Sequence, residues 1–206
     1  MLQYHTIDKP TLELLKQLQQ TALFKELRLV GGTSLALQIG HRTSIDIDLF
    51  GSIEADELEI NRALAGIGSL TQLKSSTNIH IYLLNNVKVA IVNYPYPWLS
   101  APIQEDDLLL AGITDIAAMK IAAITGRGSK KDFIDLYFIL QQMPLEKITE
   151  YYTAKFKDGS LFMALKSIVY FDDADQDEMP NMFAPVNWEK IKRSVTSAYQ
   201  DYIQRS

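Results

Sequence analysis

The stretch LVGGTSLALQIGHRTSIDIDLF, residues 29–50, predicts a strand, a glycine turn, a short helix and a second strand in succession. An apolar segment runs into Gly31 and Gly32, and the helix follows at residues 35–39. In residues 44–50 apolar and polar residues alternate, which is the period of a half-buried strand. This succession favours an α+β fold at the start of the chain.

The rest of the chain predicts further elements on both sides of a boundary near residue 100. We expect a hairpin at residues 78–92, helices at 10–23, 56–65, 115–124, 131–142, 146–156, 159–168 and 188–204, and an acidic loop at 171–180. The chain therefore predicts an α+β lobe in residues 1–100 and an almost wholly helical lobe in residues 101–206.

Composition and charge exclude several classes of protein. The 206 residues are 47% hydrophobic, which is enough for a substantial core. Cysteine is absent and only His5, His41 and His80 occur, so cysteine zinc sites, thiol nucleophiles and multi-histidine metal sites are excluded. We expect His80 to be a strand residue that faces solvent. A net charge of −5 excludes a basic protein that coats nucleic acid. Without a long apolar run or a signal-peptide pattern, we expect a soluble cytoplasmic protein with no membrane partner.

Asp46 and Asp48 form the first candidate site. Strand residues at i and i+2 point to the same face, about 6.8 Å apart at the backbone, so their carboxylates can converge on divalent cations. Such hard oxygen ligands suit Mg²⁺ or Mn²⁺, and magnesium usually completes its shell with substrate phosphates and water. The alternative is that both carboxylates belong to the exposed polar face of an edge strand.

The glycine turn is the second candidate site. Gly31 and Gly32 allow a phosphate to approach backbone amides at the start of a helix, and Thr33 or Ser34 can add a hydroxyl. Arg42, beside the carboxylate strand, is a further candidate for nucleotide binding. The alternative is a tight structural turn whose serine or threonine caps the helix.

A third group of candidates lies in the helical half. Lys120 is surrounded by apolar residues in its helix and can present a point charge to phosphate, or extend to solvent. Asp132 and Asp135 share one side of the next helix, where they either belong to its first turns or serve a site. In the second case Asp132 orients Lys120 or accepts a proton.

Arg127, Lys130 and Lys131 make the link between these two helices basic. This loop is either a contact for a nucleic-acid backbone or a solvated loop.

Taken together, the motifs resemble a known family. The glycine turn followed by Asp-x-Asp is similar to the signature of the nucleotidyltransferase superfamily typified by DNA polymerase beta. The wording of this region resembles the AbiEii/AbiGii toxin family of type IV toxin–antitoxin and phage-abortive systems. The resemblance lies in GGTSLALQIGHR followed by S-IDIDLF. Two later stretches are similar to that family's downstream regions. They are residues 115–136, DIAAMKIAAITGRGSKKDFIDL, and the later arrangement YFDDAD–MP–M–W–IK.

The resemblance implies a nucleotidyltransferase-fold mixed sheet with flanking helices, and a helical lobe that completes the active-site cleft. It also implies that an acceptor hydroxyl attacks the α-phosphorus of a nucleoside triphosphate and displaces pyrophosphate. The acceptor is an RNA, in particular a tRNA 3′ end, or a protein, and a cognate antitoxin is an expected partner. The implied triphosphate ligands are Gly31, Gly32 and Thr33; the implied metal ligands are Asp46 and Asp48; the downstream matches are Lys120, Arg127, Lys131, Asp132 and Asp135.

One departure from the wider superfamily concerns its third carboxylate, which comes from a later strand. No Asp or Glu occurs between Glu59 and Glu105, and Ala90 and Val92 stand where an acid is expected. Asn93 is the nearest polar residue, and it is a weak metal ligand and a poor base. Two alternatives therefore stay open: a nucleotide-binding module without turnover, and a phosphotransferase of kinase type.

Overall fold

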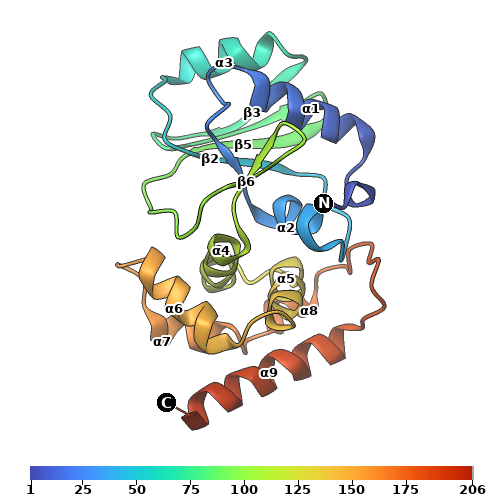
Figure 1. Cartoon of the computed structure of the whole chain (residues 1–206), viewed down its shortest axis with the longest axis vertical. Coiled ribbons are helices and arrows are strands. Elements are labelled where there is room, and N and C mark those ends of the chain that lie inside the picture. The colour runs from blue at the N-terminus through green and yellow to red at the C-terminus, as the bar shows by residue number, and fades with distance from the viewer. Residues whose placement is uncertain (206) are drawn as a thin grey trace. The chain divides into compact units, whose positions relative to one another are not determined.

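The structure, a computed structural model, describes residues 1–205 and divides into two compact units (Figure 1). The first unit comprises Met1–Pro95 and Ala101–Ala111. The second comprises Tyr96–Ser100 and the chain from Gly112 onward. The chain therefore crosses between the units more than once.

Within the described residues, the first unit is built on a seven-stranded mixed sheet with the strand order β3-β4-β5-β2-β1-β7-β6. The pairs β2–β5 and β1–β7 are parallel and the others are antiparallel, which confirms the expected mixed sheet. The strands are β1 (Arg28–Leu29), β2 (Ile47–Gly51), β3 (Leu70–Ser75), β4 (Ile79–Leu84), β5 (Val87–Asn93), β6 (Ile103–Glu105) and β7 (Leu108–Leu110).

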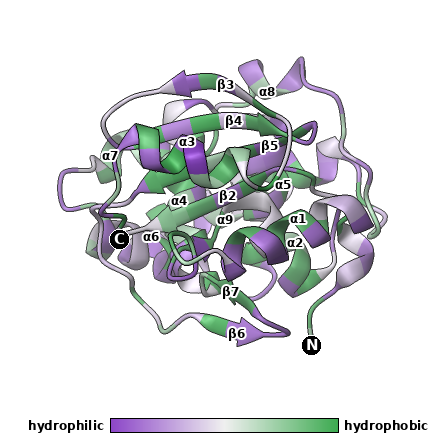
Figure 2. Ribbon diagram, turned by 90° about the horizontal axis from the view of Figure 1, so that it is seen from above, coloured by the Kyte–Doolittle hydropathy of each residue, from purple (hydrophilic) through white to green (hydrophobic). Residues whose placement is uncertain are grey.

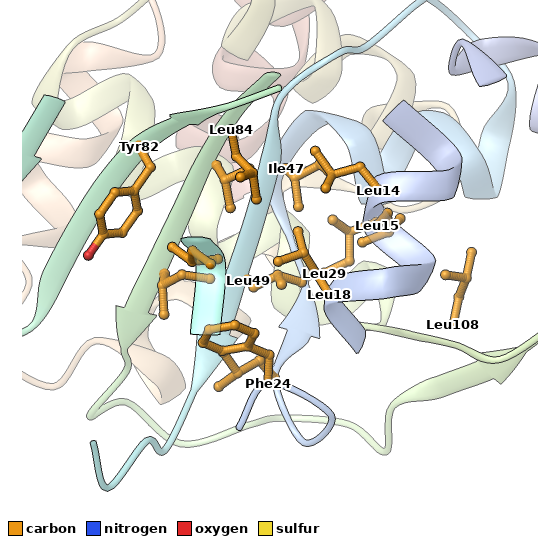
Figure 3. Packing of buried hydrophobic residues seen from close by; sticks show 14 of the residues in the cluster. Leu14, Leu15, Leu18, Phe24, Leu29, Ile47, Leu49, Tyr82, Leu84 and Leu108 are labelled. Atoms are coloured by element: carbon orange, nitrogen blue, oxygen red, sulfur yellow. The ribbon is translucent and has the colours of Figure 1, made fainter. Parts of the chain in front are cut away.

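One face of this sheet forms the hydrophobic core of the first unit. Leu15 and Leu18 of helix α1 (Lys9–Gln20) are fully buried and lie with Leu29, Ile47 and Leu49 of the central strands (Figure 3). Each such side chain contributes about 1.5–3 kcal/mol by leaving water. The other helical elements of this unit are η1 (Tyr4–Thr6), α2 (Gly31–Ile39) and α3 (Glu57–Ala65).

The second unit is helical. In it α4 contacts α5, α6 and α7, and α9 contacts α5 and α6. Its helices are α4 (Ile113–Gly126), α5 (Lys130–Leu140), α6 (Leu145–Lys155), α7 (Leu161–Ser167), α8 (Asp172–Asp175) and α9 (Trp188–Arg205). No helix within residues 1–205 is long and apolar enough to span a membrane.

The structure corrects several expectations about elements. The chain after residue 100 is not almost wholly helical, because β6 and β7 complete the sheet of the first unit, and β3 was not expected at all. Figure 2 shows that the edge strands β3 and β6 carry hydrophilic residues, whereas the central strands are mostly hydrophobic. The inner strand β7 is hydrophobic but only three residues long. The acidic loop contains the short helix α8.

Two expectations about the hairpin have opposite outcomes. The turn is confirmed, since Asn85 and Asn86 both have positive φ, as a two-residue hairpin turn requires. The expectation that His80 faces solvent is wrong. His80 is buried, and its Nδ1 lies 2.9 Å from the Ser75 hydroxyl on the neighbouring strand.

Candidate active site

The start of α2 lies directly against the carboxylate of Asp48. Asp48 is half-buried in β2 between the fully buried Ile47 and Leu49, and its carbonyl accepts a 2.9 Å hydrogen bond from Val30. A Cβ atom on Gly31 would lie 2.7 Å from Asp48 Oδ2. Gly31 also has a φ of 68°, which L side chains rarely adopt. Only glycine at position 31 therefore allows the Asp48 carboxylate to lie so close to the start of α2.

Gly32 has a corresponding role for Arg42. A Cβ atom on Gly32 would collide with Arg42 Nη2 and lie 3.4 Å from Ser44 Oγ. Arg42 is buried, and its Nη1 donates a 2.9 Å hydrogen bond to the Thr43 carbonyl. The N-cap residue of α2 is Val30, whose own side chain makes no cap hydrogen bond. The start of this helix thus combines main-chain amides with a buried guanidinium, and both favour an anion.

The hydroxyls of Thr33 and Ser34 are directed into the protein. Both residues are buried. The Thr33 hydroxyl donates to the backbone carbonyl of Asp46 and lies 2.8 Å from Ser44 Oγ, while Ser34 Oγ accepts from Gln38 at 3.1 Å. These two side chains hold the loop and the helix, so the groups of this turn that face a ligand are backbone amides.

Asp46 is positioned differently from the expectation. It lies one residue before β2, and Ile45 is 58% exposed, so the expected alternation of buried apolar residues begins only at Ile47. Asp46 is half-buried, and its backbone is held by the Thr33 hydroxyl. The two aspartates therefore come from a strand and from the segment that leads into it.

The donor set fits a magnesium ion that arrives with a nucleotide. Among residues 1–205 no group of three histidine or acidic side chains is arranged to hold a metal ion. Parallel pairing places Ala90 of β5 opposite Asp48, where a third acid would stand. Mg²⁺ is usually bound by one or two carboxylates, together with waters and substrate phosphates. Asp46 and Asp48, beside the start of α2, match that mode and not an all-protein cage.

The second unit holds a buried charge network. Lys120 of α4 is buried, and its Nζ lies 3.0 Å from Asp132 Oδ1 and 2.6 Å from Asp135 Oδ2, both of α5. Arg127 donates to both oxygens of Asp132, at 2.8 and 3.1 Å. Ser129 Oγ donates to Asp132 at 2.8 Å. The expected meeting of Lys120 and Asp132 across adjacent helices is confirmed.

These donors determine the acidity of Asp132. Burial by itself raises the pKa of this carboxyl, but Lys120, Arg127 and the Ser129 hydroxyl outweigh burial and lower the pKa to about 2. A carboxylate with so low a pKa is a weak proton acceptor at neutral pH. Of the two roles expected for Asp132, the network favours orienting Lys120 and Arg127.

The basic link between α4 and α5 does not present all its charges to solvent. The side chain of Arg127 is 68% exposed and Lys131 is exposed. Lys130, in contrast, is buried, and its ammonium group donates to the backbone carbonyls of Asp175 and Asp177. The expectation that Lys130 belongs to a surface for nucleic acid is therefore wrong.

Sequence reasoning missed a second buried ion pair in this unit. Lys155 and Asp115 are fully buried, 2.8 Å apart. Asp115 also accepts hydrogen bonds from the backbone of Leu99 and Ser100, and Lys155 Nζ lies 4.6 Å from the ring centroid of Trp98. The pair fastens the segment Tyr96–Ser100 to the helices. The two charges are 40 positions apart, so the sequence carried no local signal of their pairing.

The fold resembles solved structures of known proteins. JHP933 from Helicobacter pylori superposes with a TM-score of 0.59 at 16% identity, over 97% of this chain and 94% of that one. MenT4, a nucleotidyltransferase toxin from Mycobacterium tuberculosis, superposes with a TM-score of 0.60 at 15% identity, over 92% and 81%. At these identities the likeness is one of fold.

The sequence itself identifies the family. A protein of Aquifex aeolicus, aq_aa25, is 32% identical over 204 residues, which cover 96% of this chain and 98% of that protein. The family described as "Nucleotidyl transferase AbiEii toxin, Type IV TA system" matches residues 13–205. The chain therefore belongs to the AbiEii family of nucleotidyltransferase toxins.

Proposed function

We propose that the protein is a metal-dependent nucleotidyltransferase that moves a nucleoside monophosphate from a nucleoside triphosphate to a hydroxyl group of an RNA or a protein. The observation that carries this proposal is the approach of the Asp48 carboxylate to Gly31 at the start of α2. The helix start attracts phosphate, whereas a carboxylate beside it repels phosphate. A divalent cation between the two removes the conflict.

Asp46 and Asp48 are the residues that would hold Mg²⁺ or Mn²⁺. When bound, the ion neutralises phosphate charge and aligns the reacting groups. Thr33 supports this arrangement, because its hydroxyl fixes the backbone of Asp46.

The triphosphate is bound mainly by backbone groups. The amides of Gly31, Gly32 and Thr33 point out of the first turn of α2 and suit the β- and γ-phosphates. Arg42, held against Gly32, adds a buried positive charge. Ser34 contributes indirectly, by fixing the helix through Gln38.

We assign the charge network of the second unit to the phosphates and the acceptor. Lys120 and Arg127 stabilise negative charge that develops during transfer. Asp132 and Asp135 hold Lys120 in place. Lys131, which is exposed, suits the phosphate backbone of an RNA acceptor.

The family description supports the biological setting. The description names a type IV toxin–antitoxin system, which supports a cognate antitoxin as a partner. We propose a tRNA 3′ end as the first acceptor to test and a protein hydroxyl as the second.

Labelled nucleotides test the proposal. Each nucleoside triphosphate, labelled once in the α-phosphate and once in the γ-phosphate, is incubated with the protein, Mg²⁺ and either total RNA or cell protein. Label from the α-phosphate in the acceptor is the expected result, and it should disappear with EDTA and in Asp48→Ala. Label from the γ-phosphate would instead indicate kinase chemistry.

One observation favours a second candidate, a nucleotide-binding module without turnover. Ala90 stands opposite Asp48, so the strand that supplies a third acid in the wider superfamily has none here. Triphosphate binding with no labelled product from any acceptor, in a protein shown to be folded, would support this module and contradict the proposed transfer.

A further inference from the structure

The acidic segment Phe171–Asp177 is fastened to the start of α5. Lys130, the first residue of that helix, donates its backbone N–H to Asp177 Oδ2 at 2.9 Å. The ammonium group of the same lysine reaches the backbone carbonyls of Asp175 and Asp177. One buried lysine thus ties the segment to α5 through both its main chain and its side chain.

The same segment is also tied to the start of α9. Asp175 Oδ1 accepts from the indole N–H of Trp188, and from Lys192 at 3.1 Å. The rings of Phe133, Phe171 and Trp188 lie 4.9 to 6.0 Å apart, pairwise. These contacts join α5, the acidic segment and α9 into one assembly around the buried Phe133.

This assembly changes how α5 is capped. Ser129 occupies the N-cap position of α5, but its side chain makes no cap hydrogen bond. Its hydroxyl instead donates to Asp132 Oδ2 at 2.8 Å. The carboxylate of Asp177 supplies the acceptor and the negative charge that a helix start favours. Asp177 thus satisfies the first main-chain N–H of α5 from 47 residues away, directly beside the residue whose hydroxyl donates to Asp132.

We propose that Asp177 and Lys130 are positioning residues for the candidate catalytic network: by capping and anchoring α5, they keep the Ser129 hydroxyl on Asp132 and so fix Lys120 and Arg127. The inference rests on the proposed function for its kinetic consequence. It assigns a role to the acidic segment Phe171–Asp177. Without Asp177 the N–H of Lys130 loses its acceptor, the first turn of α5 is held less firmly, and the Ser129 hydroxyl is no longer fixed against Asp132.

The test compares Asp177→Ala with Asp173→Asn in the full-length chain. Asp173 lies in the same acidic segment and is exposed, so its variant controls for a lost negative charge. Two quantities are measured: the pKa of the Asp132 carboxyl by ¹³C NMR titration, and kcat and KM for nucleotidyl transfer. Asp177→Asn, which keeps a hydrogen-bond acceptor, is the rescue variant.

In Asp177→Ala we expect the pKa of Asp132 to rise and kcat to fall on the order of tenfold, with KM for the triphosphate within about twofold of its original value. Asp177→Asn should recover part of both losses, and Asp173→Asn should change neither. If Asp177→Ala matches Asp173→Asn in the pKa of Asp132 and in kcat, the positioning role is overturned. If the unmodified chain transfers no nucleotide, the proposed function fails, and the pKa of Asp132 alone still decides the positioning role.

Discussion

Replacing Asp132 by asparagine removes the negative charge at the centre of the buried network. Lys120, Arg127 and Ser129 all donate to this carboxylate, which is itself fully buried. The asparagine amide keeps one acceptor oxygen but brings an NH₂ group toward these donors. Lys120 then keeps the carboxylate of Asp135 as a charged partner but loses that of Asp132.

The size of the effect follows from the pKa of the carboxyl. Asp132 has a pKa of about 2 against an ordinary value of 3.8, and each pKa unit corresponds to about 1.4 kcal/mol. The charged form therefore contributes about 2 kcal/mol to the free energy of unfolding. Loss of one partner from a buried ion pair typically costs about 3–5 kcal/mol, part of which the asparagine carbonyl offsets. We expect Asp132→Asn to lose about 2–3 kcal/mol at pH 7.

The pH dependence has a definite sign. The pKa of Asp132 is lower in the folded protein than in the unfolded chain, so its contribution is present above about pH 4 and is lost as the pH falls toward about 2. Asp132→Asn should therefore be less stable than the original protein at pH 7, and the difference should shrink between pH 4 and pH 2.

Urea unfolding followed by circular dichroism measures both effects, with Asp173→Asn as the exposed control. We expect the control to lie within about 0.5 kcal/mol of the original protein. Equal unfolding midpoints and slopes for Asp132→Asn and the control at pH 7 would refute the argument that this network stabilises the helical unit.

Three further predictions concern activity. Asp48→Ala should abolish transfer without a change in the unfolding midpoint, since a half-buried aspartate adds little to the core; normal turnover would remove it from the site. Gly32→Val should weaken binding of a non-hydrolysable triphosphate in a titration, because its Cβ meets the buried Arg42, and an unchanged Kd in a folded variant would contradict this. Lys120→Ala should lower kcat by on the order of a hundredfold. Lys120→Arg should restore only part of that rate, because a planar guanidinium does not replace a compact ammonium charge. If Lys120→Ala and the original protein transfer label at equal rates in a labelled-nucleotide assay, the lysine is purely structural.

The sequence predicted what depends on local pattern. Strongly periodic helices and the central hairpin were found, since their residues alternate between core and solvent with a clear period. The glycine turn was found because paired glycines before a short helix allow a phosphate to approach backbone amides, and Asp48 because it belongs to an Asp-x-Asp pattern in an alternating strand. The meeting of Lys120 and Asp132 followed from a short link between antiparallel helices.

The features that the sequence did not predict lie at the edges of the sheet or depend on residues far along the chain. The strands β3 and β6 lie at the two edges of the sheet, so only part of each is buried and no alternation marks them. Lys130 resembles a surface lysine until Asp175 and Asp177 cover it from far along the chain. Ile45 and Ile47 look equivalent in the pattern, but only Ile47 lies within a paired strand.

The repeated crossing of the chain between its two units limits how the gene can be divided. A fragment that ends at Pro95 lacks β6 and β7, and a fragment that begins at Gly112 lacks the segment Tyr96–Ser100 that Asp115 and Lys155 hold. Recombination at a single breakpoint would therefore either remove β6 and β7 from the sheet unit or remove the segment Tyr96–Ser100 from the helical unit. We expect the helical half of this family to diverge by point substitution together with its sheet, and not to be exchanged as a cassette between unrelated transferases.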